Sequence, residues 1–163
     1  MATLTMAATA QKLTKAQKAS MEMMCKCQIP IVQEYWNEYS GTLEELGTTL
    51  MQLPKYRSQD GLGYNAKVYA HYFGGATDIF ITEREGELMF GYAILNGDCE
   101  MSEFGDFSLE EIRSLPLELD FHWEIKSLKE ALQDTDDYFE GLKQQTRVYR
   151  SGTPFVFSIF FRN

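Results

Sequence analysis

AKVYAHYFGGATDIFITEREGELMFGYAILNG, residues 66–97, contains three runs rich in β-branched and aromatic side chains, separated by short turns that contain glycine. These runs predict strands at 66–73, 78–83 and 88–95. Asn96-Gly97, which follows the third run, is the strongest short hairpin signal that a sequence contains. Because short turns join the neighbouring runs, the stretch predicts an antiparallel meander.

Helices are predicted on both sides of this meander by four Ser/Thr-x-x-Glu/Gln patterns. In each pattern the hydroxyl and the Glu or Gln side chain satisfy free backbone N–H groups at a helix start. The four patterns predict helices at about 14–24, 42–53, 108–114 and 127–133. Further helices are expected at Ile31–Tyr39, where Pro30 suits a first turn, and at about 135–145.

Two more strands, at 117–123 and 153–161, complete the predicted sheet. The expected fold class is therefore α+β: an antiparallel sheet of about five strands, with helices packed on one face and at the N-terminus. We interpret the 163 residues as one domain. Its expected parts are a flexible tail at 1–10, a helical part at 11–57, a sheet core at 64–132, and a helix plus strand at 133–163.

The setting predicted for the chain is the reducing cytoplasm. Its longest apolar runs are about strand length, whereas a membrane-spanning helix needs about 20 apolar residues. The N-terminus has no basic start followed by an apolar run, so no secretory signal is predicted. The odd number of cysteines (Cys25, Cys27 and Cys99) also favours a reducing compartment.

No cofactor or metal is predicted from motifs. Cys25-Lys26-Cys27 lacks the spacing of a zinc knuckle or a redox motif, so these cysteines are interpreted as small packing residues. The sequence also contains no glycine-rich phosphate loop, no nucleophile elbow and no His-Glu-x-x-His motif.

Charge is unevenly distributed along the chain. Residues 78–140 hold 18 of the 24 Asp and Glu residues and four Lys or Arg residues, a net charge of −14 against −9 for the whole chain. Such a region repels phosphate, which disfavours nucleic-acid binding by the acidic centre. The segment 143–163 is basic and aromatic; we interpret it as a strand that completes the sheet, with a weak nucleic-acid contact as the alternative. The acidic residues proposed to form a binding surface are Asp98, Glu100, Glu103, Asp106, Glu110 and Glu111.

The predicted strand at 117–123 alternates strictly between apolar and ionisable residues. Leu117, Leu119, Phe121 and Trp123 are expected on one face of this strand, because successive side chains point to opposite faces. The candidate catalytic residues Glu118, Asp120 and His122 then share the other face, where the carboxylates would raise the pKa of the histidine. The competing interpretation, which we weight more heavily, is the solvent face of a half-buried strand.

His71 and Glu83 are two further residues considered for chemistry. If the strands at 66–73 and 117–123 are neighbours, then His71, His122 and Asp120 form a two-histidine, one-carboxylate metal site; a surface histidine or one satisfied by hydrogen bonds is the favoured alternative. Glu83, beside Arg84 at a strand end, is explained by a solvated turn but stays a candidate.

Several stretches, in the same order along the chain, resemble a bacterial family known as domain of unknown function 2958. They are Lys12–Gln17, Lys67–Phe73, Asp78–Glu83, Phe90–Tyr92, Glu100 with Ser108–Ile112, and Glu118–Trp123. The similarity covers about 12–24 and 66–132. The chain departs from the family pattern at Asp78–Phe80, where an aromatic pair is usual, and at Met101–Phe107, where a longer loop is expected.

This resemblance implies a bacterial cytoplasmic protein, often carried on plasmids, phages or other mobile elements. It implies no reaction, and it singles out Glu83, Glu118, Asp120 and His122 as motif positions. Such polar positions are also explained by constraints of the fold.

Three functions are compatible with the sequence. The favoured one is a non-enzymatic binding or inhibitory protein that docks its acidic centre on a basic protein partner. In a mobile-element setting, a host enzyme that handles nucleic acid would be a suitable partner. The protein would then be an anti-defence factor whose carboxylates imitate the phosphates of nucleic acid. The second is a small hydrolase-like enzyme that uses Glu118, Asp120 and His122. The third is an accessory module with an unrelated role.

Overall fold

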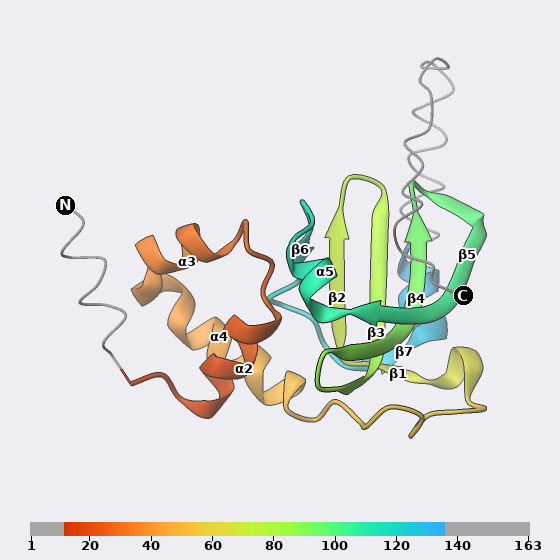
Figure 1. Ribbon diagram of the computed structural model, residues 1–163, viewed down its shortest axis with the longest axis horizontal. Helices are drawn as coiled ribbons and strands as arrows, with labels where there is room; N and C mark the ends of the chain where they lie inside the picture. The colour runs from red at the N-terminus through yellow and green to blue at the C-terminus, as the bar shows by residue number, and fades with distance from the viewer. Residues whose placement is uncertain (1–11, 136–163) are drawn as a thin grey trace, which may run out of the picture.

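The computed structural model describes residues 12–135 of the chain and has a five-stranded antiparallel sheet at its centre (Figure 1). The strand order is β5-β4-β3-β2-β6. The strands are β2 (Ala70–Gly74), β3 (Thr77–Glu85), β4 (Leu88–Leu95), β5 (Asp98–Ser108) and β6 (Glu118–Leu119). Together with the helices at the N-terminal side, this sheet confirms the predicted α+β class.

Tight turns set the register of the meander. The residue pairs Gly74 and Thr77, then Leu95 and Asp98, close two-residue turns between β2 and β3 and between β4 and β5. Asn96 and Gly97 both have positive φ, 55° and 68°, as the favoured hairpin turn requires. The meander at 66–97 is therefore confirmed, except that its first run splits at Tyr69.

The two parts of that first run belong to different sheets. Residues before Tyr69 form β1 (Lys67–Val68), which pairs with β7 (Lys126–Ser127) in a separate two-stranded sheet. Residues after Tyr69 form β2. The 3₁₀ helix η1 (Gly63–Asn65) precedes β1.

Strand β5 was not predicted, because residues 101–107 were expected to form a loop. Asp, Glu and Gly occupy five of its 11 positions, and these residues have low strand propensity. Pairing with β4 from Leu88–Ser108 to Leu95–Asp98 overrides that propensity. The sheet thus reaches five described strands through β5.

The strand predicted at 117–123 is much shorter than expected. Only Glu118 and Leu119 pair with β2, and the chain turns at 121–122. The expected alternation holds for Leu117, Leu119 and Phe121, which share one core, and fails at Trp123, which packs on the opposite face of the sheet.

Three helices precede the sheet: α2 (Lys15–Met23), α3 (Ile29–Glu34) and α4 (Trp36–Leu50). The predicted cap of α2 is confirmed, since Thr14 and Gln17 form a complete capping box. Gly47 of α4 lies so close to α2 that a Cβ would be 1.8 Å from the carbonyl oxygen of Ala16. The two helices are therefore tightly packed.

The helix start predicted at Thr42 is wrong, because Thr42 lies inside α4. The helix begins at Trp36, and its apolar stripe runs through Trp36, Tyr39, Leu43 and Leu46 toward the core. These spacings of three and four residues continue one buried face across the capping pattern. The helix predicted at Ile31–Tyr39 is instead divided by Tyr35, which has a non-helical ψ of 37°.

The helices α2 and α4 and the short helix α5 (Leu109–Arg113) pack on one face of the sheet. Ser108 caps α5 through the N–H of Glu111, as predicted. The core on this face contains helix residues such as Met23, Leu43 and Ile112, together with the strand residues Ala70, Tyr72, Ile79, Ile81, Met89 and Ala93.

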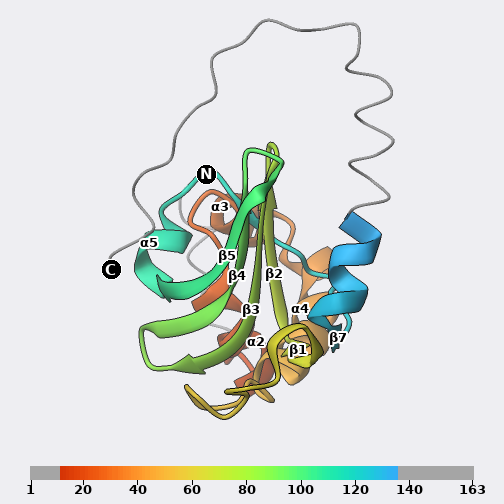
Figure 2. The same cartoon turned by 90° about the vertical axis from the view of Figure 1, so that its right-hand side faces the viewer.

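The opposite face of the sheet is also covered, so the expectation of helices on one face is wrong. Residues 128–135 are helical, and Leu128 and Ala131 pack with Phe80 and Tyr92. Figure 2 shows this helix in blue on one side of the sheet and α5 on the other. Its predicted cap is confirmed, since Ser127 accepts a hydrogen bond from the N–H of Glu130.

The short edge strand β6 is held by a side chain rather than by another strand. Gln28, which is 8% exposed, donates to the carbonyl of Leu119 (3.1 Å) and accepts from its N–H (2.8 Å). The amide of Gln28 thus replaces a neighbouring backbone and anchors the segment that leads to Asp120.

The tail predicted at 1–10, the strand at 153–161 and almost all of the helix at 135–145 lie outside the described residues. Within 12–135, no helix is long and apolar enough to cross a membrane.

Candidate functional site

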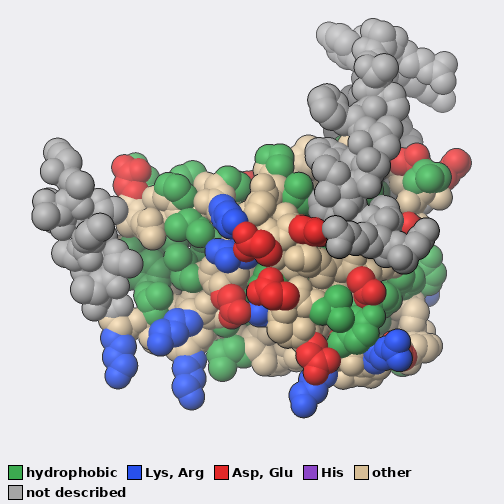
Figure 3. All heavy atoms as spheres, in the orientation of Figure 1, with side chains coloured by type: hydrophobic (Ala, Val, Ile, Leu, Met, Phe, Trp, Pro, Cys, Tyr) green, Lys and Arg blue, Asp and Glu red, His purple; other side chains and the backbone are tan. Residues whose placement is uncertain are grey.

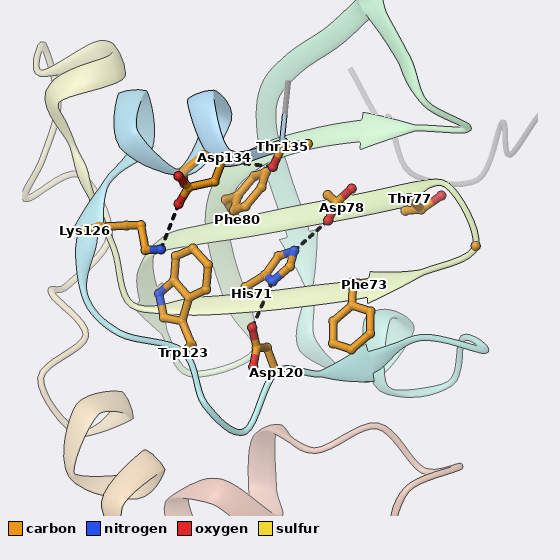
Figure 4. Close-up of a pocket in the computed structure, with 12 residues that line it drawn as sticks. His71, Phe73, Thr77, Asp78, Phe80, Asp120, Trp123, Lys126, Asp134 and Thr135 are labelled. Atoms are coloured by element: carbon orange, nitrogen blue, oxygen red, sulfur yellow. Dashed lines mark hydrogen bonds and ion pairs between the residues drawn. The ribbon is translucent and has the colours of Figure 1, made fainter. Parts of the chain in front are cut away.

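A pocket of about 380 Å³ opens between β2, β3, the segment after β6 and the helix at 128–135 (Figure 4). Pockets of about 300–1,000 Å³ are typical of ligand sites. Four aromatic rings, those of His71, Phe73, Phe80 and Trp123, line it. Its charged lining residues are Asp78, Asp120, Lys126 and Asp134.

His71 lies at the centre of the pocket between two carboxylates (Figure 4). Its Nε2 is 2.7 Å from Oδ1 of Asp78, and its Nδ1 is 3.4 Å from Oδ2 of Asp120. The register explains both contacts. His71 is opposite Phe80, so Asp78 is its diagonal neighbour on the same face. The N–H of Asp120 donates to the carbonyl of His71 at 2.8 Å, which brings the second carboxylate to the ring.

These contacts favour a positively charged imidazole. Burial opposes the charge, but the hydrogen bonds to Asp120 and Asp78 outweigh it, and the pKa of His71 is raised above its ordinary value. The hydrogen bond from His71 likewise lowers the pKa of Asp120. His71 is therefore held between two carboxylates that favour its protonated form.

Aromatic rings surround this imidazole. Its ring stacks on Phe80 with a centroid distance of 4.8 Å and an interplanar angle of 7°, and it lies 5.6 Å from Phe73 and 5.0 Å from Trp123. The Trp123 indole N–H donates to the carbonyl of Val68 at 3.0 Å, which fixes its orientation.

A second cation lies on the other side of Trp123. Nζ of Lys126 is 4.8 Å from the centre of the indole ring and 3.1 Å from Oδ2 of Asp134. A cation above an aromatic face is attracted by the negative potential of the ring. Lys126 and His71 thus both lie against the ring of Trp123.

The arrangement is suited to binding a cation rather than to proton transfer. A general base needs a free nitrogen within hydrogen-bond reach of its substrate. In His71 both ring nitrogens face carboxylate oxygens. Three carboxylates line the pocket against one ammonium, that of Lys126.

The structure places the four candidate catalytic residues apart. Asp120 lines the pocket, but Glu118 and His122 are exposed and do not line it. His122 contributes only its N–H, which donates to Oδ1 of Asp120 at 2.9 Å. The proposed Glu118–Asp120–His122 face therefore is not a single site in this fold.

Glu83 is 1% exposed rather than solvated. Its carboxylate accepts hydrogen bonds from the backbone N–H groups of Arg57 and Gln59. A buried carboxylate that satisfies two backbone donors holds a loop in place. The solvated-turn interpretation of Glu83 is therefore wrong, and the residue anchors the segment that precedes η1.

The proposed metal arrangement also has no counterpart in the described part of the chain. Strands β2 and β6 are neighbours, as that hypothesis required, and they bring His71 to Asp120. His122 does not join them, and within residues 12–135 no group of three His, Cys, Asp or Glu side chains is placed to hold a metal ion.

Cys25 is packed in the core, whereas Cys27 is exposed. Burial raises the pKa of the Cys25 thiol to about 12, so this group is protonated at neutral pH and is not a nucleophile.

The six residues of the predicted acidic surface lie along one edge of the sheet. All are exposed, and they follow one another along β5 and α5, at the edge of the sheet. We call this set the acidic edge. In the view of Figure 3, most of the carboxylates lie over the half of the molecule that holds the sheet and α5 rather than over the N-terminal helices.

The sequence interpretation missed most of the pocket: Phe73, Asp78, Trp123, Lys126 and Asp134. A usable signal existed for Asp78. A two-residue turn at Gly75-Ala76 pairs His71 with Phe80 and thereby sets Asp78 diagonal to His71. No local pattern marks Lys126 and Asp134, because the path of the chain after β6 brings them to the sheet.

The chain matches no family model, no curated protein and no solved structure. The resemblance to domain of unknown function 2958 therefore stays a prediction.

Proposed function

We propose that this protein is a non-enzymatic binding module that docks its acidic edge on the basic surface of a protein partner. The observation that carries the proposal is the position of the six predicted acidic residues, all exposed on one continuous strand and helix at the rim of the sheet. Exposed carboxylates along one edge attract a positive surface and accelerate encounter with it.

Local neutralisation of the acidic edge is small. Glu110 pairs with Lys26, and Asp106 accepts a hydrogen bond from the hydroxyl of Tyr56. Glu100, Glu103 and Glu111 take part in no ion pair within the described residues. Charged side chains also protect an edge strand from pairing with other strands, but that role needs fewer charges than β5 and α5 carry together.

We also propose that the protein acts in the bacterial cytoplasm, that a mobile genetic element carries it and that it has an anti-defence role. These three points depend on the sequence resemblance alone. The alternative, a small hydrolase-like enzyme that uses Glu118, Asp120 and His122, has less support. Glu118 and His122 lie outside the pocket, and both ring nitrogens of His71, the histidine that lines it, face carboxylates.

A pull-down from a bacterial lysate tests the proposal with three proteins. They are the natural chain, an edge variant (Glu100→Gln, Glu103→Gln, Glu111→Gln) and a control variant with the same charge change on exposed residues of α3 and α4 (Glu34→Gln, Glu38→Gln, Glu44→Gln).

We expect the natural chain and the control variant to retain a discrete basic protein at about 50 mM salt and to release it at about 500 mM, because salt screens exposed charges. The edge variant should not retain it. Equal capture by all three proteins, or capture that salt does not change, would contradict a partner held by the acidic edge.

A further inference from the structure

The pocket at His71 already holds two nitrogen-bearing side chains in the same manner. The imidazole of His71 lies flat on Phe80 and is bonded to Asp78 and Asp120. The ammonium of Lys126 lies over Trp123 and is bonded to Asp134. In both cases an aromatic face and a carboxylate contact the group, which is the combination that recognises organic cations.

We infer that this pocket is a second binding site, separate from the acidic edge, that takes the planar guanidinium group of an arginine side chain. The pocket residues assigned to the arginine side chain as a whole are Asp120 and Asp134, which attract its charge, and Phe73, which offers a flat surface. The inference does not depend on the proposed function, because it uses different residues on the sheet and a ligand that is defined by its own chemistry.

Access supports this choice of contacts. The side chains of Asp120 and Asp134 are 30% and 69% exposed, and Phe73 is 37% exposed. The side chain of Asp78 is only 17% exposed and has the shorter contact with His71. An incoming group therefore meets Asp120, Asp134 and Phe73 first.

The lining selects the chemical class of the ligand. Three carboxylates exclude an anion, and the aromatic rings favour a flat group over a compact one. A guanidinium is planar and weakly hydrated, stacks on aromatic faces and binds carboxylates through paired N–H donors. A volume of about 380 Å³ also leaves room for an aliphatic stem.

Lys126 is the internal competitor for such a ligand. Its ammonium occupies the face of Trp123 and the carboxylate of Asp134. Removal of Lys126 should therefore favour the guanidinium, whereas removal of the Asp134 charge should disfavour it. If the Lys126–Asp134 ion pair were purely structural, loss of either partner would change the affinity for the guanidinium in the same direction.

Titration of the full chain, followed by NMR, tests this site. The probes are N-acetyl-arginine amide and its uncharged analogue N-acetyl-citrulline amide. The chain has two tryptophans, and the hydrogen-bonded indole N–H of Trp123 reports on the pocket. The indole of Trp36, which packs against the core between the sheet and the helices α2, α4 and α5, is the internal control.

We expect a saturable shift of the Trp123 signal with the arginine probe, no shift of Trp36, and no saturation with the citrulline probe. Asp134→Asn should weaken binding about tenfold or more, the usual effect of losing a charged hydrogen bond. Lys126→Met should strengthen binding, and Glu124→Gln, an exposed neighbour that does not line the pocket, should leave it unchanged.

A peptide with one arginine between glycines identifies the source of the group. Tighter binding of this peptide than of the capped amino acid indicates a protein ligand, and equal binding indicates a free guanidinium compound. The inference is overturned if the arginine and citrulline probes act alike. It is also overturned if Asp134→Asn and Lys126→Met change affinity in the same direction.

Discussion

The two faces of the central sheet differ in chemistry although the same strands build both. In β2, Tyr72 points to the helix-side core and is fully buried, whereas its neighbours His71 and Phe73 line the pocket. The hydroxyl of Tyr72 is satisfied by the carbonyl of Met23 at 2.7 Å. The helix-side face contains uncharged, buried side chains, and the opposite face contains aromatic rings with carboxylates among them.

This difference follows from the period of two in a strand. One face is closed by α2, α4 and α5, so each of its residues contributes mainly by burial. The other face is closed only in part, by the helix at 128–135 and by Tyr64 of η1, which packs on Tyr92 and Phe104, and it keeps charged groups next to rings. Substitutions on the first face should change stability, and substitutions on the second should change recognition and pH dependence.

The first prediction compares two separate truncations, one on each face of the sheet. The truncation on the face that α2, α4 and α5 cover should have the largest effect on stability. Ile79 is fully buried on the helix side, so Ile79→Ala should lower the free energy of unfolding by about 2–5 kcal/mol. Phe73→Ala removes a ring that is 37% exposed and should cost less than about 1 kcal/mol while weakening binding of the arginine probe. Urea denaturation and the NMR titration measure the two quantities, and equal losses of stability would remove the distinction between the faces.

The second prediction concerns Glu83, the buried carboxylate opposite Phe90 on the aromatic face. Glu83→Gln weakens its bonds to the N–H groups of Arg57 and Gln59 and should lower stability by about 1–3 kcal/mol. Glu85→Gln, at an exposed position of the same strand, should change it by less than about 0.5 kcal/mol. Unfolding by urea measures both. A loss of arginine binding in the absence of any loss of stability would assign Glu83 to recognition instead.

Local signals were sufficient for the meander and for three helix starts. The turn at Asn96-Gly97 and the caps at Thr14, Ser108 and Ser127 act within a few residues, and the structure has each of them. Thr42 shows the limit of such signals, because an apolar stripe that continues from Trp36 outweighed its capping pattern. Strand β5 shows another, because pairing with β4 outweighed its acidic composition.

The pocket was harder to predict because its residues come from segments far apart in the sequence. The alternation at 117–123 singled out Asp120, which lines the pocket, but it grouped Asp120 with Glu118 and His122, which do not. His71 meets Asp120 through a pairing of β2 with β6 that involves two residue pairs. Gln28, 91 residues before Leu119, holds β6 in that position. No periodic pattern contains this information.

The third prediction is a pH dependence that arises from His71 and Asp120 on the pocket face of the sheet. The pKa of His71 is raised above its ordinary 6.5, so its contribution to stability is complete below that pH and is lost as pH rises through the folded value. The pKa of Asp120 is lowered from 3.8, so its contribution is complete above that pH and is lost in acid. The pair should therefore stabilise the fold most between these two values.

Unfolding by urea at several pH values measures this contribution. From pH 6.5 upward, the free energy of unfolding of the natural chain should fall by roughly 1 kcal/mol, the size of one hydrogen bond. His71→Asn should remove the fall, and Asp78→Asn should reduce it. His122→Asn is the matched control, because His122 is exposed and lies outside the pocket. If His122→Asn removes the fall instead, the pH dependence arises from His122 and the prediction for His71 is wrong.

The smallest expected effect compares two helix caps, one on each side of the sheet. Thr14→Ala removes the cap of α2, and Ser127→Ala removes the cap of the helix that carries Asp134. Each change should lower the free energy of unfolding by about 0.5–1 kcal/mol, because a backbone N–H loses its acceptor. Only Ser127→Ala should also weaken binding of the arginine probe, since fraying of that helix moves Asp134 away from Lys126 and Trp123. Urea denaturation and the NMR titration of both variants give the comparison. If the two caps have equal effects on arginine binding, recognition depends on the stability of the whole fold and not on the helix at 128–135.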